Sequence, residues 1–225
     1  MAKKFDNIVI GGGLVGSLAS LVLSANSESV CLIEKNKYNN LTTDSYSPLS
    51  LTLNSVQFLK EKNLWDQKYF KCRSINRLKI KLFNSFNTIN LYSEDLNLTS
   101  LGSVIEKASF LSFLRDLCNK DKNITIIDEA NVELNDPDNP KCIIFSDSLE
   151  QFEYGKLIIT DGANSKFAKD LRIKSTKIDY NQTSYIFNAQ YDGSTESAYQ
   201  IFTKRGVVAI LPGSNSNRSI VATIH

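Results

Sequence analysis

The stretch that decides the fold is residues 5–34, FDNIVIGGGLVGSLASLVLSANSESVCLIE. A short apolar run, Ile8 to Ile10, has the β-branched residues of a buried parallel strand. Three glycines in G-x-G-x-x-G spacing follow, then an apolar helical run from Leu14 to about Ala25, then a second strand, Val30 to Ile33, that ends at Glu34. This order predicts a dinucleotide-binding βαβ unit. The alternative is a glycine-rich turn that binds no ligand.

Each part of such a unit has its own physical task. Gly11 permits the tight turn out of the strand, Gly13 lets backbone N–H groups approach a pyrophosphate, and Gly16 lets the helix pack closely on the sheet. The phosphates would lie at the helix N-terminus, where unpaired N–H groups and the helix dipole favour anions. Glu34 can accept hydrogen bonds from a ribose diol.

Composition excludes several classes of function. A net charge of +2 over 225 residues gives no reason to expect a nucleic-acid partner. The one histidine, His225, leaves no residues for a His-based metal site or a Ser-His-Asp triad, so we expect no metal site. The four cysteines show no C-x-x-C spacing, no secretory signal is recognised, and the apolar run Leu14–Leu23 is too short to span a bilayer. We therefore expect a cytoplasmic protein.

The rest of the chain alternates helical and strand patterns. We expect helices at Leu49–Leu64, Val104–Asn119 and Ser165–Leu171, and Trp65 as a packing anchor. Strands with turn signals between them are predicted at Leu78–Leu82, Ile89–Leu91, Asn123–Asp128, Cys142–Phe145, Gln151–Tyr154, Leu157–Ile159, Tyr185–Tyr191, Ala198–Thr203, Val207–Leu211 and Ser219–Ile224. The first two of these should form an antiparallel hairpin.

A second informative stretch is KLIITDGANS, residues 156–165. Here an apolar strand ends in Asp161 and Gly162. An acid at the carboxyl end of a strand lies at the sheet edge where open α/β folds bind ligands. An ordinary Asp-Gly turn is the alternative, and this stretch alone does not decide between the two.

The two motifs together resemble a known family. Residues 6–17, DNIVIGGGLVGS, are similar to the N-terminal FAD fingerprint of the flavin-dependent aromatic hydroxylases of the p-hydroxybenzoate hydroxylase fold. Within these, the chain looks most like the ubiquinone-biosynthesis (2-polyprenylphenol) hydroxylases. Residues 161–165, DGANS, are similar to the second FAD motif of that family, and residues 51–65, 101–106, 211–212 and 219–221 add weaker support.

The resemblance implies a fold and a reaction. The fold would be α/β, with a Rossmann-like FAD-binding domain (residues 1–72 and 99–172) interleaved with a β-sheet substrate domain (residues 73–98 and 173–225). FAD would be the cofactor, and NAD(P)H would be a possible electron donor. With O₂ the flavin would form a C4a-hydroperoxide that hydroxylates a phenol, here a polyprenylphenol, and the cofactor would supply this chemistry. Association with the inner face of a membrane or with a biosynthetic complex is also implied.

The site residues follow from the two motifs. We expect the cofactor to be bound by Gly11, Gly13, Leu14, Val15, Gly16, Glu34, Lys35, Asp161 and Gly162, and we assign no catalytic side chain. Of these, the glycines would bind the pyrophosphate, Glu34 the adenosine ribose, and Asp161 the ribityl and pyrophosphate region.

The sequence departs from the family in three places. The family has an arginine in the loop that reads DSYSP at residues 44–48 here, and another after the second motif, where this chain has Lys166. The third FAD motif, a Gly-Asp before a His-containing helix, is absent. We therefore expect a truncated form of the fold. A dinucleotide-binding remnant without catalysis, or another FAD/NAD(P) oxidoreductase such as a prenyl reductase, remains an alternative.

Overall fold

The computed structural model describes residues 2–38, 47–136, 138, 142–190, 196–213 and 217–225. Contacts divide the chain into two compact units, each made of two segments. Unit 1 comprises residues 1–42 and 111–176, and unit 2 comprises residues 43–110 and 177–225. Helix α3 (Lys107–Lys120) runs through the boundary between the units at residue 110.

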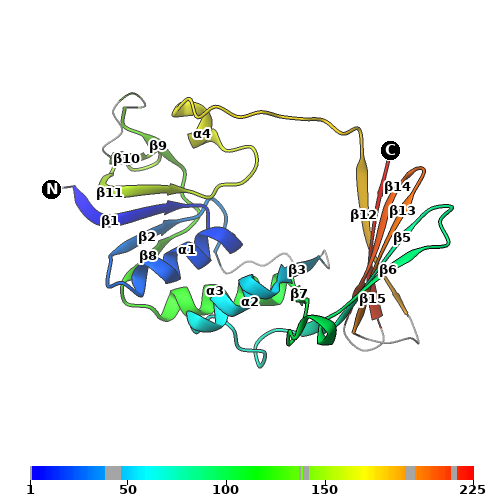
Figure 1. Cartoon of the computed structure of the whole chain (residues 1–225). Helices are drawn as coiled ribbons and strands as arrows, with labels where there is room; N and C mark the ends of the chain where they lie inside the picture. The colour runs from blue at the N-terminus through cyan, green and yellow to red at the C-terminus, as the bar shows by residue number, and fades with distance from the viewer. Residues whose placement is uncertain (1, 39–46, 137, 139–141, 191–195, 214–216) are drawn as a thin grey trace. The chain divides into compact units, whose positions relative to one another are not determined.

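Unit 1 is built on a six-stranded sheet in the order β8-β2-β1-β11-β10-β9 (Figure 1). The pairs β8–β2, β2–β1 and β1–β11 are parallel, and β10 pairs antiparallel with both β11 and β9. Its elements are β1 (Lys3–Ile10), α1 (Leu14–Ser24), β2 (Val30–Ile33), β8 (Ile124–Ile127), β9 (Val132–Leu134), β10 (Cys142–Phe145), β11 (Gln151–Ile159) and α4 (Lys166–Asp170).

The register of unit 1 brings the two sequence motifs together. Ile10 at the end of β1 pairs with Ile33 of β2 and with Ile159 of β11. The residues that follow these three strands therefore emerge at one edge of the sheet, the carboxyl edge. Gly11, Glu34 and the Thr160–Asp161 segment are consequently neighbours, although up to 150 residues separate them in the sequence.

The central strands of unit 1 are apolar because both faces are covered. All four residues of β2 are buried, and so are Ile8, Val9 and Ile10 of β1. A cluster around these strands includes Phe5, Phe145 and Phe152, with ring centroids 4.8 to 5.5 Å apart. This burial stabilises the strands whose ends carry the motifs.

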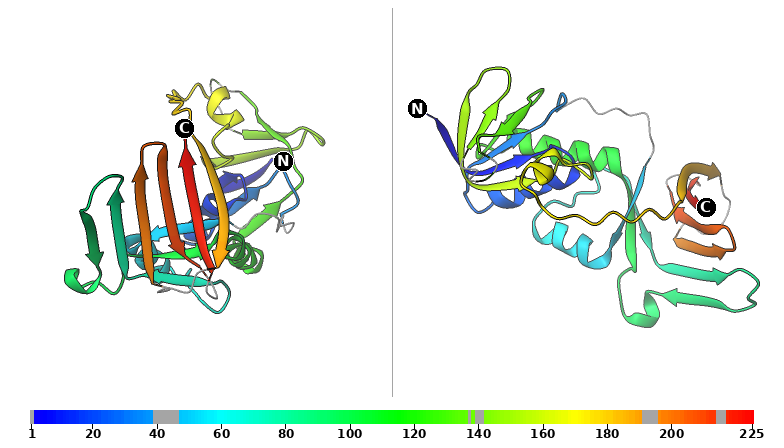
Figure 2. Two further views of the ribbon diagram at one scale, coloured as in Figure 1. Left: turned by 90° about the vertical axis from the view of Figure 1, so that its right-hand side faces the viewer. Right: turned by 90° about the horizontal axis from the view of Figure 1, so that it is seen from above.

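Unit 2 contains a six-stranded sheet in the order β12-β15-β14-β13-β5-β6, seen face-on in the left view of Figure 2. A smaller sheet has the order β3-β7-β4. The elements are β3 (Pro48–Thr52), α2 (Leu53–Glu61), β4 (Cys72–Ile75), β5 (Arg77–Leu82), β6 (Thr88–Tyr92), η1 (Glu94–Leu96), β7 (Gly102–Glu106), β12 (Thr183–Gln190), β13 (Ser197–Thr203), β14 (Gly206–Pro212) and β15 (Asn217–Ile224). β5 and β6 form the predicted antiparallel hairpin.

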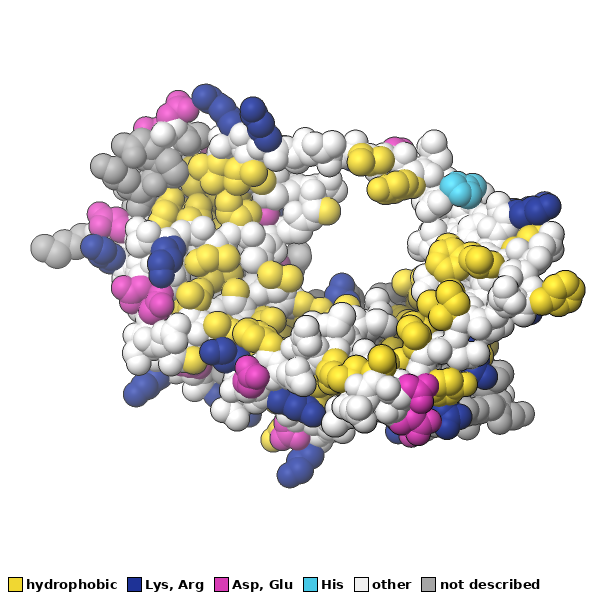
Figure 3. All heavy atoms as spheres, viewed as in Figure 1, with side chains coloured by type: hydrophobic (Ala, Val, Ile, Leu, Met, Phe, Trp, Pro, Cys, Tyr) yellow, Lys and Arg dark blue, Asp and Glu magenta, His cyan; other side chains and the backbone are white. Residues whose placement is uncertain are grey.

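Large apolar side chains remain exposed on the six-stranded sheet of unit 2. Figure 3 shows hydrophobic side chains at the surface over these strands. They include Leu82, Ile89, Ile186 and Phe187, each between 48% and 56% exposed. Trp65 packs within the same unit against Phe70, as predicted, with the two rings edge to face and their centroids 5.1 Å apart.

Four predicted elements are wrong in their extent. Residues 48–52 form strand β3 and not the start of a helix, because they pair with β7; helix α2 begins only after Thr52, which caps it by accepting from the N–H of Ser55. Likewise, residues 102–106 form strand β7, so the helix begins at Lys107 and not at Val104. The two strands expected at 151–154 and 157–159 are one strand, β11, which continues through Gly155.

Two further short strands, β4 and β9, were not predicted either. Each has only three or four residues. Within the described residues, no helix is long and apolar enough to cross a membrane.

Candidate functional site

A cavity of about 820 Å³ lies at the carboxyl edge of the unit 1 sheet. Backbone and side chains from the ends of β1, β2 and β11 line it, together with the segments before β9 and at the start of α4. The lining residues are Ile10, Gly11, Gly13, Ile33, Glu34, Lys35, Asn36, Ala130, Asn131, Val132, Glu133, Ser146, Thr160, Asp161, Gly162, Asn164, Lys166 and Phe167. Both motifs found in the sequence thus contribute to one cavity.

Two glycines of the first motif lie where neighbouring backbone leaves no room for a side chain. Gly11 has a φ of +99°, and a Cβ there would lie 2.5 Å from the carbonyl oxygen of Thr160. At Gly16 a Cβ would lie 1.8 Å from the carbonyl oxygen of Gly11. These two residues therefore allow β1, β11 and α1 to approach closely, as the sequence predicts.

Gly13 differs from Gly11, Gly12 and Gly16 because there is empty space where a side chain would be. A Cβ at this position would meet nothing within 4 Å, and the backbone has an ordinary φ of −74°. Gly13 is the N-cap residue of α1, it lines the cavity, and no side chain caps the helix start. N–H groups in the first turn of α1 are therefore available to an anion.

The Glu34 carboxylate is held in place by backbone donors. Its Oε2 accepts from the N–H of Gly12 at 2.6 Å, and its Oε1 accepts from the N–H of Asn36 at 3.0 Å. The side-chain amide of Asn36 also donates to Oε1, at 3.4 Å; an ionised carboxylate has about four acceptor positions, so capacity remains for a ribose hydroxyl. Glu34 is thus oriented at the cavity wall before any ligand arrives.

The second motif is fixed to the first by Thr160. The Oγ1 of Thr160 lies 2.7 Å from the carbonyl oxygen of Ile10 and 2.9 Å from that of Gly11, and it donates to them. Next to it, Asp161 accepts through Oδ2 from the N–H of Lys166 at 3.2 Å. Gly162 has a φ of +96°, with open space where a Cβ would be. The Asp-Gly turn therefore presents its backbone and carboxylate to the cavity.

Lys166, which stands where the family has an arginine, forms an ion pair with Glu133. Its Nζ lies 2.7 Å from Oε1 of Glu133, and both residues line the cavity. Their hydrogen bond and charges raise the pKa of Lys166 and lower the pKa of Glu133. This pair places one positive and one negative charge on the lining of the cavity.

The structure brings most, but not all, of the predicted site residues to the cavity. Those that line it are Gly11, Gly13, Glu34, Lys35, Asp161 and Gly162. Leu14 begins α1, Val15 is 67% exposed on that helix, and Gly16 is buried; these three are absent from the lining. Residues 44–46 of the DSYSP loop lie outside the described residues, so the effect of the arginine missing from this loop is not tested by the structure.

Sequence reasoning missed two residues behind the glycine loop. Arg115 of α3 and Tyr38 are both buried, and the Arg115 guanidinium donates to the carbonyl oxygens of Gly12 and Tyr38. Arg115 lies 103 positions after Gly12, and in the helical pattern of α3 it reads as an ordinary surface charge. Leu114 precedes it and Asp116 follows it, so its neighbours in the sequence do not mark Arg115 as buried.

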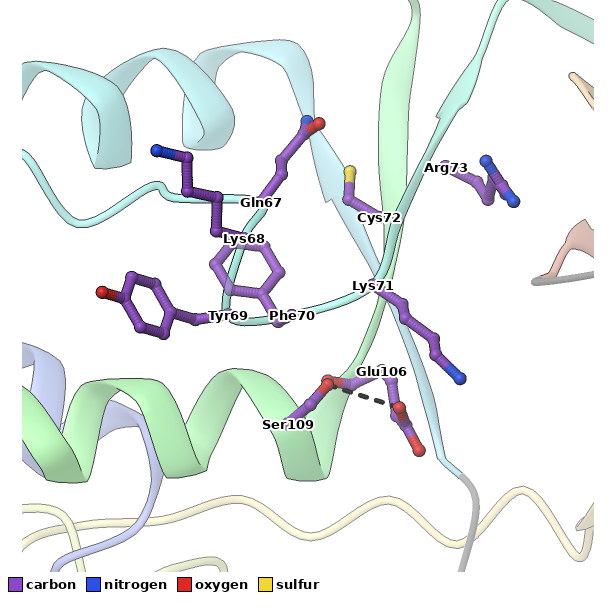
Figure 4. Close-up of a pocket in the computed structure, with 9 residues that line it drawn as sticks. All are labelled: Gln67, Lys68, Tyr69, Phe70, Lys71, Cys72, Arg73, Glu106 and Ser109. Carbon is purple, nitrogen blue, oxygen red and sulfur yellow. Dashed lines mark hydrogen bonds between the residues drawn. The ribbon is translucent and has the colours of Figure 1, made fainter.

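A second cavity, of about 450 Å³, belongs to unit 2 (Figure 4). It lies between the segment from Gln67 to Arg73 and the start of α3, where Ser109 donates to the carboxylate of Glu106 at 3.3 Å. Side chains of both charges, including Lys71 and Glu106, line it. The cavity contains none of the predicted site residues.

Comparison with known proteins identifies the family of the chain. The model of the family "Glucose inhibited division protein A" matches residues 6–210, which include both motifs. The chain belongs to this family. It is also 27% identical, over 236 residues, to the mitochondrial ubiquinone biosynthesis monooxygenase COQ6 of Caenorhabditis elegans, and 24% identical, over 226 residues, to the 3-demethoxyubiquinol 3-hydroxylase of Escherichia coli. These matches confirm the resemblance predicted from the motifs.

The matches cover nearly all of this chain but only part of the relatives. They include 96% and 95% of the chain, against 51% and 56% of the two relatives. The chain therefore spans about half the length of the curated relatives it matches. Among solved structures, PqsL of Pseudomonas aeruginosa, described as a probable FAD-dependent monooxygenase, matches with a TM-score of 0.79 at 12% identity, covering 99% of this chain and 61% of that one. This likeness confirms the predicted fold class.

Proposed function

We propose that the chain is the FAD-binding part, with its associated sheet, of a monooxygenase that hydroxylates the ring of a polyprenylphenol in ubiquinone biosynthesis. The observation that supports it most directly is the single cavity shared by the two motifs. The glycine loop, the uncapped start of α1, the Glu34 carboxylate and the Asp161–Gly162 turn all line it or border it. The names of the relatives supply the reaction class and the substrate class.

The residues present fit an FAD in this cavity. The N–H groups at the start of α1 would bind the pyrophosphate, since no side chain caps them and Gly13 leaves open space beside them. Glu34 would accept hydrogen bonds from the adenosine ribose, and Asp161 would contact the ribityl and pyrophosphate region. The cofactor, once bound, would supply the activation of O₂ and the transfer of one oxygen atom to the ring. The residues of this chain would bind and orient it.

Several finer expectations belong to the same proposal. NAD(P)H would be the electron donor, and a phenol with a polyprenyl chain would be the substrate together with O₂. The apolar residues exposed on the unit 2 sheet, such as Ile186 and Phe187, are compatible with an apolar substrate or with peripheral association with a membrane. We also propose the domain division at residues 1–72 and 99–172 against 73–98 and 173–225 as the functional one.

Isotope labelling tests the reaction. The FAD-loaded chain would be incubated with NADPH or NADH, a 2-polyprenylphenol and ¹⁸O₂, and the lipid extract analysed by mass spectrometry. The proposal expects one ¹⁸O atom on the ring of the product, with the second oxygen atom leaving as water and the two electrons coming from the nicotinamide. FAD binding without any labelled product would instead favour a non-catalytic dinucleotide-binding protein. Reduction of the prenyl chain would favour a reductase.

A further inference from the structure

Arg115 is a buried arginine that pairs with no carboxylate among the residues that the structure describes. The residue is only 9% exposed, and in the described part of the chain no ion pair includes it. A guanidinium keeps its charge at every physiological pH, so this position holds a permanent buried positive charge. Burying such a charge is costly unless hydrogen bonds or an anion compensate it.

Hydrogen bonds to the glycine loop supply part of that compensation. Nε and Nη2 of Arg115 donate to the carbonyl oxygen of Gly12 at 3.2 and 3.0 Å, and Nη1 donates to the carbonyl oxygen of Tyr38. The guanidinium also lies over the Tyr38 ring, 4.6 Å from its centroid. All these partners are neutral, so none of them cancels the positive charge.

Arg115 thereby fixes the peptide between Gly12 and Gly13. Ser17 Oγ adds a further hydrogen bond to the Gly12 carbonyl at 3.3 Å, and Glu34 accepts from the Gly12 N–H. A trans peptide is planar, with its N–H directed opposite to its C=O. Because Arg115 holds the Gly12 carbonyl, the Gly13 N–H must point away from Arg115, and Gly13 is the residue with open space beside it.

Tyr38 completes the support behind the loop. It is 1% exposed, its hydroxyl lies 3.1 Å from Ser17 Oγ, and its ring lies where a Cβ on Gly12 would come within 2.7 Å. The Tyr38 ring and the Arg115 guanidinium therefore hold the backbone of Gly12 in one conformation.

We propose that Arg115 is a positioning residue for the diphosphate of the cofactor: it orients the Gly13 N–H towards the diphosphate and provides a buried positive charge behind the loop that an anionic ligand would balance. The proposal deepens the function proposed above and rests on it. It concerns the diphosphate alone, because no contact joins Arg115 to the carboxylate of Glu34, which is the group assigned to the ribose.

The test compares ADP with adenosine as ligands, using NMR titration of the full chain. In Arg115→Met we expect ADP to bind at least about tenfold more weakly, because a charge-assisted contribution is lost, while adenosine affinity changes by less than about twofold. Arg172→Met is the matched control, since it removes the same charge from an exposed position in unit 1 and should leave both affinities unchanged. A merely structural role would weaken both ligands in parallel with a fall in thermal stability.

The outcomes separate this proposal from the one it rests on. If the unaltered chain, shown to be folded by circular dichroism, binds neither ADP nor FAD, the proposed cofactor site is wrong. If it binds both and Arg115→Met binds ADP equally well, the role of Arg115 is wrong. Should Arg115→Met not fold, Arg115→Lys decides, because one ammonium group cannot serve both carbonyls in the same geometry. The proposal expects weaker ADP binding by Arg115→Lys, and an unchanged affinity would overturn it.

Discussion

Gly13→Val is the substitution that best separates ligand binding from folding. A Cβ at Gly13 meets no atom within 4 Å, and the φ of −74° suits any residue. Valine is a poor N-cap residue, which costs about 1 kcal/mol, but replacing glycine restricts the unfolded chain and recovers about 0.4–1 kcal/mol. We therefore expect the free energy of unfolding to change by less than about 1 kcal/mol.

Binding should respond very differently. The valine side chain would occupy the space beside the start of α1 where the pyrophosphate is proposed to lie. We expect FAD affinity to fall by about 100-fold or more, which corresponds to about 2.8 kcal/mol. Flavin fluorescence during titration measures the affinity, and urea unfolding measures the stability.

Gly16→Ala supplies the contrast. Its new Cβ would lie 1.8 Å from the Gly11 carbonyl oxygen, so the main chain must move, and we expect a loss of about 3 kcal/mol or more in stability. If Gly13→Val binds FAD normally, the pyrophosphate does not lie beside Gly13. If Gly13→Val loses as much stability as Gly16→Ala does, the space beside Gly13 is not open.

Three further outcomes follow from the geometry of unit 1. Glu34→Ala removes the acceptor of the Gly12 N–H, so we expect FAD to bind about tenfold more weakly, as measured by fluorescence titration, and an unchanged affinity would contradict the role of Glu34. Burial raises the pKa of the Cys31 thiol to about 12, so the stability that this group contributes is fully present below its ordinary pKa of 9.0 and is lost as the pH rises towards 12. The free energy of unfolding should therefore be lower at pH 11 than at pH 8, and Cys31→Ala should reduce that difference. The full shift corresponds to a limit of about 4 kcal/mol. Glu133→Gln breaks the ion pair with exposed Lys166, and calorimetry should find no measurable change in melting temperature, whereas a large drop would mean that this pair stabilises the fold.

The sequence was sufficient to predict the part of the fold that depends on residues close together in the chain. In residues 5–34 the apolar run, the glycine spacing and the terminal acid each have a local physical cause, and the structure places them as expected. The Asp161 motif was ambiguous alone. The family resemblance gave it an interpretation, and the pairing of β1 with β11 brings it to the same sheet edge as the glycine motif, 150 positions away in the sequence.

The failures have equally specific causes. Residues 49–52 contain two leucines whose spacing also continues the apolar stripe of α2, so only the pairing with β7 shows that they are a strand. Gly155 seemed to end a strand, yet it is needed within β11, where a Cβ would lie 2.8 Å from the Asp6 carbonyl oxygen. Arg115 could not be assigned because its partners are backbone carbonyls far away in sequence, and carbonyls leave no mark in a sequence.

The central claim is that the cavity at the carboxyl edge of unit 1 binds FAD, and a titration of the purified 225-residue chain with FAD tests it most directly. Flavin fluorescence would be followed to saturation, with Gly13→Val measured in parallel. The account predicts saturable binding by the chain and little or none by the variant. A folded chain that does not bind FAD, or a variant that binds it equally well, would contradict the account.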